Sequence, residues 1–402
     1  MGGLRDAISA AESNPMEFVF VTAVETVCGL GLRIEECLQA LRMRRGCLRP
    51  LGDSGPETFA ELPSGLIPSR MPGKGRRYGA ASNLAVVAAR DAVRRAGWTP
   101  QMVRESWLYG ASSRGNAGEM MGRNAWRRPI RRFSASNSMH SEIAAAVSIE
   151  LGIRGPWQMC ANGCSSGLDA LGMAWMAVGS GLAPRAVVVA VDLPLVEDLL
   201  RDFRDTGLLS NNGVNDPFAI GGPHATSGFL PGEAAVAVTI ERARPGCVPL
   251  CRLEHYAANS DAYDSLMIPE DGGGITDCVR MAVESGDMRR VRAVCPHATG
   301  TMNHARVEPP ALMRALAGAD VPLIPLKPHT GHTLGASGLL DVALLAACLR
   351  EGWLPPVLDG LSAPECGLRL LEEPLIVKAG DRVIKLAAGM GGHNAAVSLA
   401  AV

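Results

Sequence analysis

Apolar runs of strand length alternate with segments of helical periodicity along most of the chain. The runs at 18–24, 187–191 and 234–240 are apolar almost throughout, which is typical of strands buried on both faces of a sheet. Further strands are expected at 253–257, 291–294, 323–325, 382–388 and 395–401. Apolar residues at three- and four-residue spacing predict helices at 34–43, 80–96, 141–151, 275–284, 307–316 and 338–349. Because strands and helices alternate, the pattern predicts an α/β fold.

The order of these elements is similar in the two halves of the sequence, which indicates an internal duplication, although no clear sequence repeat accompanies it. We therefore expect an N-terminal extension over 1–15, one half over 16–245 and a second half over 246–402. Residues 50–75 are rich in Pro, Gly and Ser and are expected to form a long loop. Residues 210–231 are expected to be rich in loops as well.

Composition and charge exclude several classes of protein. The 402 residues are 47% hydrophobic and carry a formal net charge of −1, which gives no global attraction to nucleic acid or to an anionic membrane. No apolar run is long enough to span a bilayer, and the first fifteen residues lack the apolar core of a secretory signal. The eleven cysteines contain no CxxC pair and fit a reducing compartment better than a disulfide framework, so we expect a cytoplasmic protein.

The most informative segment is 160–167, Cys-Ala-Asn-Gly-Cys-Ser-Ser-Gly, which lies directly before a helical apolar pattern. At a turn from strand to helix, unpaired N–H groups and the helix dipole would favour the thiolate form of Cys164. Small neighbours would leave its sulfur approachable, as a catalytic nucleophile requires. From this segment alone, a buried structural cysteine is an equal alternative.

Three later segments have features of active-site loops. His297 leaves an apolar strand into a loop of Thr and Gly, a position where α/β proteins bind ligands. Segment 327–338 brings Lys327 and His332 together around glycine turns. Segment 389–394, Gly-Met-Gly-Gly-His-Asn, exposes backbone N–H groups suited to an oxyanion. Each segment alone is more often structural, but together with Cys164 they supply a nucleophile, two imidazoles, a cation and an anion hole.

These segments, in this order, resemble the motifs of the β-ketoacyl synthase family, the elongating condensing enzymes of the thiolase fold. The resemblance extends from about residue 18 to residue 402, and Cys164, not Cys160, occupies the position of the nucleophile. The family motifs GFxxGE, HGTGT, KxxxGHxxGAxG and GFGG(T/H)N are similar, respectively, to residues 228–233, 297–301, 327–338 and 389–394.

The resemblance implies both a fold and a reaction. The fold would be two duplicated α/β halves in a five-layered αβαβα arrangement. The reaction would be a decarboxylative Claisen condensation, in which an acyl group on Cys164 is joined to a malonyl unit on acyl carrier protein. His297 and His332 would donate hydrogen bonds from Nε2 to the enolate that forms when CO₂ leaves. Initiating synthases of the same fold typically carry Asn at the position of His332.

The same resemblance implies supporting roles. The N–H groups of Cys164 and Met390 would form the oxyanion hole. Lys327 would orient the site, with Glu233 and Glu308 in the polar network around it. The residues expected to contact the substrate or its pantetheine arm are Thr299, Thr301, Phe229 and Met390. No metal and no bound cofactor are implied, because the substrates arrive on the phosphopantetheine of acyl carrier protein.

Four residues differ from the family pattern. The closing motif usually carries phenylalanine at two positions that are Ala388 and Met390 here, and methionine is flexible enough to loosen a gate and alter the acyl pocket. Ala298 and Ala305 replace the usual Gly and Asp. These differences favour a specialised type II polyketide or polyene pathway over housekeeping fatty-acid synthesis.

An acidic acyl carrier protein is the expected partner. The residues expected to dock it are Lys74, Arg76, Arg77, Arg201 and Arg204, although a solvated basic face is an equal interpretation. Five arginines between 123 and 132 suggest nucleic acid, but the net charge and the lack of a binding motif argue against it. By resemblance, the chain forms a homodimer or a heterodimer with a chain-length-factor homologue.

Two other functions stay open at this point. A condensing-fold acyltransferase would pass the acyl group to an oxygen or nitrogen nucleophile without decarboxylation, but it would not need both histidines. A non-catalytic subunit that sets chain length would usually lack the cysteine. The sequence does not identify the acyl chain.

Overall fold

The structure is a computed structural model that describes residues 18–68, 77–121, 134–284 and 286–402. The expected extension over 1–15 and the five arginines between 123 and 132 lie outside this range. The strands and helices of the first half are β1 (Val19–Cys28), α2 (Ile34–Arg42), β2 (Arg49–Pro50), β3 (Pro63–Ser64), α3 (Ala80–Arg95), α4 (Pro100–Glu105), β4 (Trp107–Ala111), α5 (Ala117–Met120), α6 (Ser134–Asn137), α7 (Glu142–Leu151), β5 (Trp157–Cys160), α8 (Ser166–Gly179), β6 (Arg185–Asp192), α9 (Glu197–Asp205) and β7 (Ala234–Arg242).

After a connection over residues 243–250, the second half repeats the alternation of strands and helices. Its elements are β8 (Cys251–Ser260), α10 (Gly273–Glu284), β9 (Val291–Cys295), α11 (Met302–Ala315), α12 (Lys327–Thr330), α13 (Ser337–Arg350), β10 (Trp353–Leu354), β11 (Leu375–Ile376), β12 (Arg382–Gly389) and β13 (His393–Ala400). Single 3₁₀ turns, η4 (Gly163–Ser165) and η6 (Leu334–Ala336), directly precede α8 and α13. The proposed division at residue 245 falls in the connection between β7 and β8.

Nine strands form one mixed sheet in the order β5-β4-β6-β7-β1-β8-β13-β12-β9. In the first half, β4 is parallel to β5 and β6, whereas β7 is antiparallel to β6 and β1. In the second half, β9 is parallel to β12 and to a bridge at Leu323, whereas β13 is antiparallel to β12 and β8. The two halves therefore have the same strand order and directions, which confirms the predicted duplication. They join where β1 pairs with β8 over only three residue pairs.

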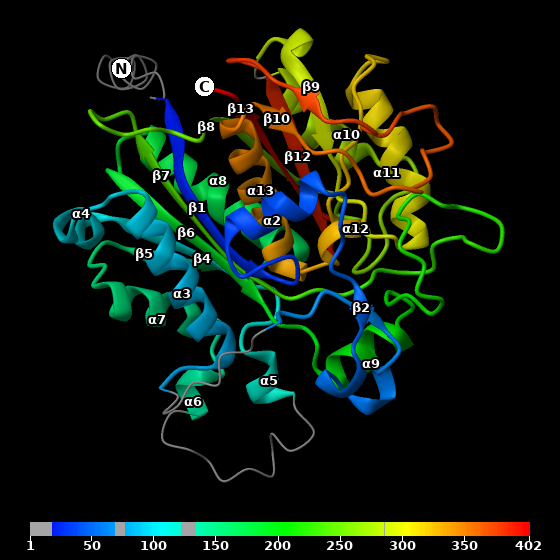
Figure 1. Cartoon of the computed structure of the whole chain (residues 1–402), viewed down its shortest axis with the longest axis horizontal. Helices are drawn as coiled ribbons and strands as arrows, with labels where there is room; N and C mark the ends of the chain where they lie inside the picture. Colours follow the sequence, from blue (N-terminus) through cyan, green and yellow to red (C-terminus); the bar gives the residue numbers. More distant parts are fainter. Residues whose placement is uncertain (1–17, 69–76, 122–133, 285) are drawn as a thin grey trace, which may run out of the picture.

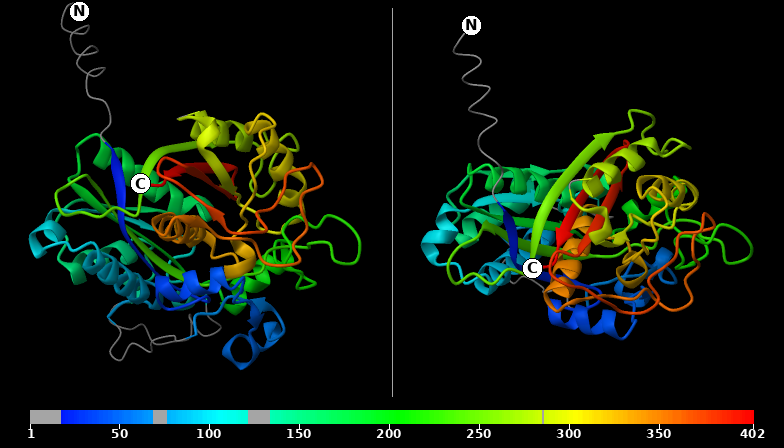
Figure 2. Two further views of the ribbon diagram at one scale, coloured as in Figure 1. Left: turned by 45° about the horizontal axis from the view of Figure 1, so that its top comes forward. Right: turned by 90° about the horizontal axis from the view of Figure 1, so that it is seen from above.

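Helices occupy three layers around these strands. α3 and α7 cover the outer side of the first-half strands, α10 and α11 cover the outer side of the second-half strands, and α8 and α13 pack between the two sets (Figures 1 and 2). The buried apolar side chains accordingly form a central core and two outer cores. Every residue of α13 before Arg350 is buried, as expected for a helix that is apolar on all sides. The predicted five-layered αβαβα arrangement is confirmed.

The two central helices approach closely at a glycine near each N-terminus. A Cβ atom on Gly167 would lie 2.9 Å from the carbonyl oxygen of Gly335, and one on Gly338 would lie 2.7 Å from Cγ of Leu168. Both glycines belong to a Ser-Gly-Leu sequence, 166–168 in α8 and 337–339 in α13, at the same distance from the start of each helix. The same three residues therefore form the crossing in both halves of the chain. The crossing also brings η4 beside η6.

Several local expectations were wrong or incomplete. The periodicity did not reveal β4, β5 or α9, and residues 323–325 form an isolated bridge rather than a strand. α11 begins at Met302, five residues before the predicted start at 307, and carries Pro309 and Pro310 inside it. Prolines favour the first turn of a helix, so the sequence pattern placed the start too late. Within the described part of the chain, no helix has both the length and the apolar character that crossing a membrane requires.

Replacing Gly167 by alanine should destabilise the fold, because the new methyl group would press on backbone atoms of η6 that no side-chain movement can relieve. We expect a loss of about 1–3 kcal/mol in the free energy of unfolding, measured by denaturant titration. Gly118→Ala in α5 is the control, since its Cβ would meet only Val196 at 3.9 Å. Equal stability of the two variants would contradict the close crossing.

Candidate active site

Cys164 lies in η4, at the turn from β5 into α8, as the sequence predicted. Gly163 adopts a left-handed φ of 63°, a conformation that glycine tolerates without steric cost, and so allows this sharp turn. The cysteine is only 6% exposed, and it lines a cavity of about 290 Å³. The sulfur is therefore shielded from bulk water but faces a space large enough for part of a substrate.

His332 contacts the sulfur directly. Its Nε2 atom lies 3.1 Å from Sγ of Cys164, and the residue is buried. The backbone holds His332 in place, since its N–H donates to Leu230 and its carbonyl oxygen accepts from Gly232. Residues 228–233, which resemble the GFxxGE motif, thus hold the segment of His332 through backbone hydrogen bonds. The ring of Phe229, from the same segment, packs edge-on against His332 with 5.2 Å between ring centroids.

His297 lies beside His332 at the end of β9, with 5.5 Å between the two ring centroids. The buried Glu308 carboxylate accepts the backbone N–H groups of His297 and Ala298, and the Lys327 ammonium donates to the His297 carbonyl oxygen. The loop that carries His297 is therefore fixed from both sides by charged groups. The structure brings the predicted Cys164, His297, His332, Lys327 and Glu308 into one cluster.

Two further charged residues, Asp341 and Lys385, lie next to this cluster, and neither was predicted from the sequence. Asp341 of α13 lies 3.9 Å from the Lys327 ammonium and 2.6 Å from that of Lys385. Lys385 also donates to the carbonyl oxygen of Pro296 at 2.9 Å. The sequence did contain a signal for Lys385: it is a lysine within the apolar run of β12, and a buried lysine almost always has a partner.

Burial and these cations determine the charge of the site. Burial, together with the nearby Lys327 cation, holds the pKa of His297 and that of His332 well below the usual range, so both imidazoles are neutral. Burial raises the pKa of the Cys164 thiol to about 12, although Lys327 opposes this. Burial lowers the pKa of Lys327 to about 8. The expectation of a thiolate was therefore wrong for the free site: desolvation outweighs the favourable position at the helix N-terminus.

His304 is a third imidazole in the cavity and was not predicted. Its ring lies 5.0 Å from that of His297, and burial lowers the pKa of His304 to about 4. Its Nδ1 atom lies 3.9 Å from the Glu308 carboxylate, beyond hydrogen-bonding distance. No sequence motif includes His304, so its place in the cavity is seen only in the structure, where the first turn of α11 carries it.

Met390 lies on the turn between β12 and β13, next to the nucleophile. A Cβ atom on Gly163 would lie 3.6 Å from the Met390 nitrogen, and one on Gly389 would lie 3.5 Å from the Cys164 nitrogen. The two backbone N–H groups predicted as an oxyanion hole are therefore neighbours across the two halves of the fold. The Met390 side chain lines the cavity that Cys164 and His332 also line.

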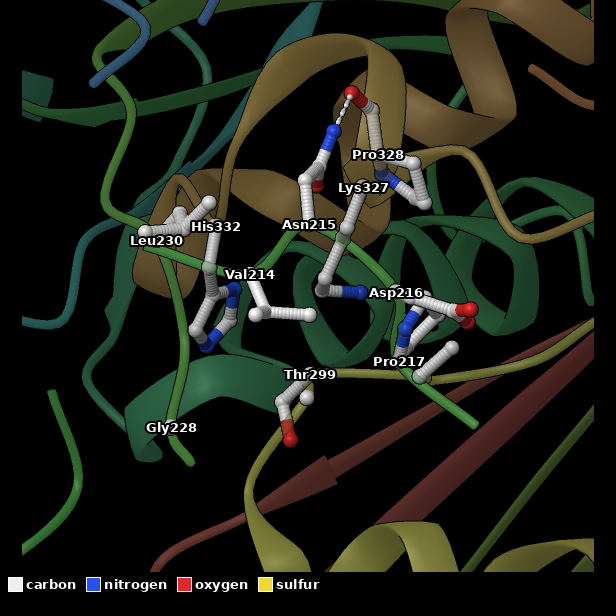
Figure 3. A pocket seen from close by; sticks show the side chains of 12 residues that line it. Val214, Asn215, Asp216, Pro217, Gly228, Leu230, Thr299, Lys327, Pro328 and His332 are labelled. Carbon is white, nitrogen blue, oxygen red and sulfur yellow. Dashed lines mark hydrogen bonds between the residues drawn. The ribbon is translucent and has the colours of Figure 1, made fainter. Parts of the chain in front are cut away.

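The residues expected to contact substrate lie around the same space. Thr299, Thr301, Phe229 and Met390 all line the main cavity, and the two threonine hydroxyls are 3.1 Å apart. Lys327, His332 and Thr299 also border a smaller cavity of about 20 Å³, which has room for one water molecule (Figure 3). Glu233 lies further away: its carboxylate accepts the N–H of Ile67 at 3.4 Å.

The predicted docking residues are only partly described. Lys74 and Arg76 lie outside the described residues, and Arg77 is exposed. Arg201 and Arg204 project from α9, each with a side chain 45% exposed. Phe203, on the inner side of the same helix, lines the main cavity.

The Cys164, His297 and His332 ligand atoms lie within 4.8 Å of one another, a spacing that a metal such as zinc accepts. The buried Lys327 cation beside them opposes a dication, and the neutral thiol is not a ready ligand. The donor set therefore fits acyl transfer better than a resident metal.

Comparison with known proteins agrees with this site. The family described as "Beta-ketoacyl synthase, N-terminal domain" matches residues 67–245, and "Beta-ketoacyl synthase, C-terminal domain" matches residues 250–360, together well over half of the chain. The chain belongs to the β-ketoacyl synthase family.

Relatives within this family come from polyketide and fatty-acid systems. The tetracenomycin polyketide synthase ketoacyl synthase alpha subunit of Streptomyces glaucescens is 27% identical over 378 residues, 86% of each chain. The 3-oxoacyl-[acyl-carrier-protein] synthase 2 of Rhizobium meliloti is 26% identical over 386 residues, 90% of this chain and 89% of its own. A relative from Streptomyces cyaneus aligns at 29% identity over 271 residues, 64% of each chain.

Solved ketosynthases share the fold. A type II polyketide synthase ketosynthase in complex with its acyl-carrier protein, AntDE:AntF, superposes with a TM-score of 0.84 at 21% identity, covering 96% of this chain and all of that one. The ishigamide ketosynthase/chain length factor superposes with a TM-score of 0.85 at 20% identity, with the same coverage. These likenesses confirm the thiolase-like fold.

One departure from the family pattern has a visible backbone consequence. Ala298, where the pattern has glycine, adopts a left-handed φ of 44°. This conformation costs an alanine about 1–2 kcal/mol. The Glu308 carboxylate accepts the Ala298 N–H at 2.8 Å and so helps to hold the strained residue beside His297.

Alkylation of Cys164 by iodoacetamide should show that the thiol is protonated in the free protein. Because the pKa of this thiol is about 12, the rate should rise about tenfold per pH unit from pH 7 to 9 without a plateau. Peptide mass spectrometry separates this site from the other cysteines. Lys327→Met should react more slowly than wild type at pH 7, since the lysine cation favours the thiolate, and the difference should shrink by pH 9, because the pKa of Lys327 is about 8. A plateau below pH 9 would show instead that the thiolate is already stabilised.

Glu308→Gln should cost about 1–3 kcal/mol in the free energy of unfolding, because the amide group would turn a donor toward one of two buried backbone N–H groups. Denaturant titration measures the loss. The exposed Glu365→Gln is the control and should change stability by less than about 0.5 kcal/mol. No difference between the two variants would mean that Glu308 does not fix the His297 loop.

Proposed function

We propose that this chain catalyses the decarboxylative Claisen condensation of a Cys164-bound acyl group with a malonyl unit on acyl carrier protein, giving a β-ketoacyl-acyl carrier protein. The observation that carries the proposal is the contact of Cys164 Sγ with His332 Nε2 at 3.1 Å, with His297 beside them in one cavity. A nucleophile with two neutral imidazoles suits a reaction that builds up negative charge twice, first on a thioester oxygen and then on an enolate.

Acyl transfer would begin with the neutral thiol. Cys164 passes its proton to His332 Nε2 as Sγ attacks the thioester carbon. The N–H groups of Cys164 and Met390 hold the oxyanion, the carbon–sulfur bond to the carrier breaks, and the leaving pantetheine sulfur takes the proton. His332 thus returns to the neutral state that burial favours.

In the second step, a malonyl thioester enters and its bond to the carboxylate breaks. CO₂ leaves, and the electron pair becomes an enolate whose oxygen accepts hydrogen bonds from Nε2 of His297 and His332. The enolate carbon attacks the acyl carbon on Cys164, the bond from that carbon to Sγ breaks, and the sulfur leaves as a thiolate that takes a proton from solvent to regenerate the thiol. His332 must donate here but accept in the first step. No described residue bonds its buried Nδ1 atom, so no partner fixes the ring in one tautomer.

Residues around this centre have supporting roles in the proposal. Lys327 and Glu308 hold the His297 loop, and Thr299 and Thr301 bind the pantetheine arm. Phe229 and Met390 form the wall beside the acyl group. Glu233 has a structural part through the segment that supports His332.

The proposed partners are an acyl carrier protein and a second subunit, identical or a chain-length-factor homologue. Two solved structures of the same fold support them, one a complex with an acyl-carrier protein and one a ketosynthase/chain length factor. Arg77, Arg201 and Arg204 are exposed, and α9 connects its arginines to the cavity wall through Phe203. Lys74 and Arg76 remain part of the proposed docking surface. All eleven cysteines are free thiols, which supports a cytoplasmic location.

Intact mass after mixing with acyl-loaded carrier proteins of several chain lengths tests the proposal. We expect an acyl adduct on the wild type, none on Cys164→Ala, and discharge with CO₂ release when malonyl carrier is added. His297→Asn should still take up the acyl group but condense about 100-fold more slowly, because one enolate donor is displaced. An adduct that leaves without CO₂ release would favour a non-decarboxylating acyltransferase. An absent adduct would favour a non-catalytic partner subunit.

A further inference from the structure

A buried carboxylate outside the catalytic cluster collects hydrogen bonds from both halves of the fold. Asp169 lies on α8 five residues after Cys164 and is 2% exposed. It accepts from Asn162 Nδ2 and Ser165 Oγ at 2.9 Å each, from Tyr256 OH at 2.7 Å and from His393 Nε2 at 3.0 Å. Four donors on one buried carboxylate are enough to satisfy its acceptor capacity.

The donors mark the two turns that meet at the proposed oxyanion hole. Asn162 and Ser165 flank the nucleophile, on either side of Gly163 and Cys164. His393 begins β13, three residues after Met390. A single carboxylate therefore links the turn that carries the Cys164 N–H to the turn that carries the Met390 N–H, although the two are far apart in sequence.

The turn before His393 is bonded to segment 261–265, through the Gly391 N–H to the Ser265 carbonyl oxygen at 2.9 Å and through the Asp261 N–H to the Gly392 carbonyl oxygen at 2.7 Å. Gly391 and Gly392 both adopt left-handed φ values, 85° and 76°, which glycine reaches freely and with a large choice of alternatives. The turn also lies against the nucleophile turn, since a Cβ atom on Gly389 would be 2.9 Å from the Asn162 carbonyl oxygen. Those bonds tie the turn to segment 261–265, whereas the contact of His393 with Asp169 ties it to the nucleophile turn and would help to keep the Met390 N–H at a constant distance from that of Cys164.

The contact carries charge. The hydrogen bond to Asp169 raises the pKa of His393, which favours the imidazolium form. Burial opposes ionisation of Asp169, but the bonds to it, that from His393 first, bring its pKa below the usual value. Hydrogen bonds between charged partners are shorter and stronger than neutral ones, and they restrict geometry more.

We propose that Asp169 and His393 are a positioning pair that sets the spacing of the two oxyanion-hole N–H groups across the two halves of the fold. Neither side chain touches the reacting atoms: they act through the backbone of Cys164 and Met390. The inference rests on the proposed function, because the oxyanion hole is needed only if Cys164 exchanges acyl groups with thioesters.

The test compares two reactions of the same sulfur. Attack on an acyl-carrier thioester forms an oxyanion, whereas alkylation by iodoacetamide displaces iodide and forms none. His393→Ala should therefore slow acylation of Cys164 by on the order of tenfold or more, since loss of a whole oxyanion donor costs about 100- to 1,000-fold. Its alkylation rate should stay within about twofold of wild type, because the thiol and His332 are unchanged.

Two further variants complete the experiment. His393→Gln places an amide N–H near the position of Nε2 and should restore part of the acylation rate. Tyr256→Phe is the matched control: it removes one donor from Asp169 but none from the Met390 turn, so acylation should stay within about threefold of wild type.

Each result has a distinct meaning. If Cys164 of His393→Ala is acylated at the wild-type rate, the proposed positioning role is wrong. Equal losses in the acylation and alkylation rates would also contradict it, because they would show a general disturbance of the nucleophile turn. A wild type that is alkylated but takes no acyl group from any carrier would overturn the proposed function itself, and the role of the pair with it.

Discussion

The close crossing of α8 and α13 is the contact on which the site depends. Each helix follows a 3₁₀ turn, and the glycines Gly167 and Gly338 let the two backbones approach until those turns lie side by side. Cys164 belongs to one turn, and His332 lies two residues before the other. Gly167 packs against the backbone of Gly335, and Gly338 packs against the Leu168 side chain, so close packing of the two helices sets the distance between sulfur and imidazole. The duplication thus explains how residues from opposite halves form one catalytic pair.

Charge beneath the site complements charge that appears only during the reaction. Lys327 and Lys385 share Asp341, and the three buried groups lie under neutral histidines and a neutral thiol. A thiolate–imidazolium pair would already hold negative charge in the ground state. Asp341 already balances part of the lysine charge, but Cys164, His297 and His332 carry no negative charge until an oxyanion or an enolate forms. In a site shielded from water, such preorganised charge favours the transition state over the resting state.

The sequence predicted the elements with strong periodicity and the residues that lie in motifs. It missed β4 and β5 because short strands give weak periodic signals. It missed α9 although the apolar residues Leu199, Leu200 and Phe203 lie on one face of that helix. It placed Cys164 at a helix start and concluded that the thiolate is favoured, since a pattern shows position but not depth of burial. Asp341 and Lys385 were missed because their partners are distant in sequence, whereas His304 was missed because it lies in no motif. Only the folded arrangement shows that a lone lysine in a strand has an aspartate from another helix beside it.

The departures from the family pattern are distributed unevenly around the site. Cys164, His297, His332, Lys327 and Glu308 keep the residue types of the pattern, although Ala298 beside His297 departs from it. Ala388 and Met390, by contrast, line the cavity wall where the substrate would lie. Replacement of two aromatic rings by a methyl group and a flexible thioether changes the shape of that wall without altering the donors behind it. Such a division would change which acyl chain fits before it changed the chemistry.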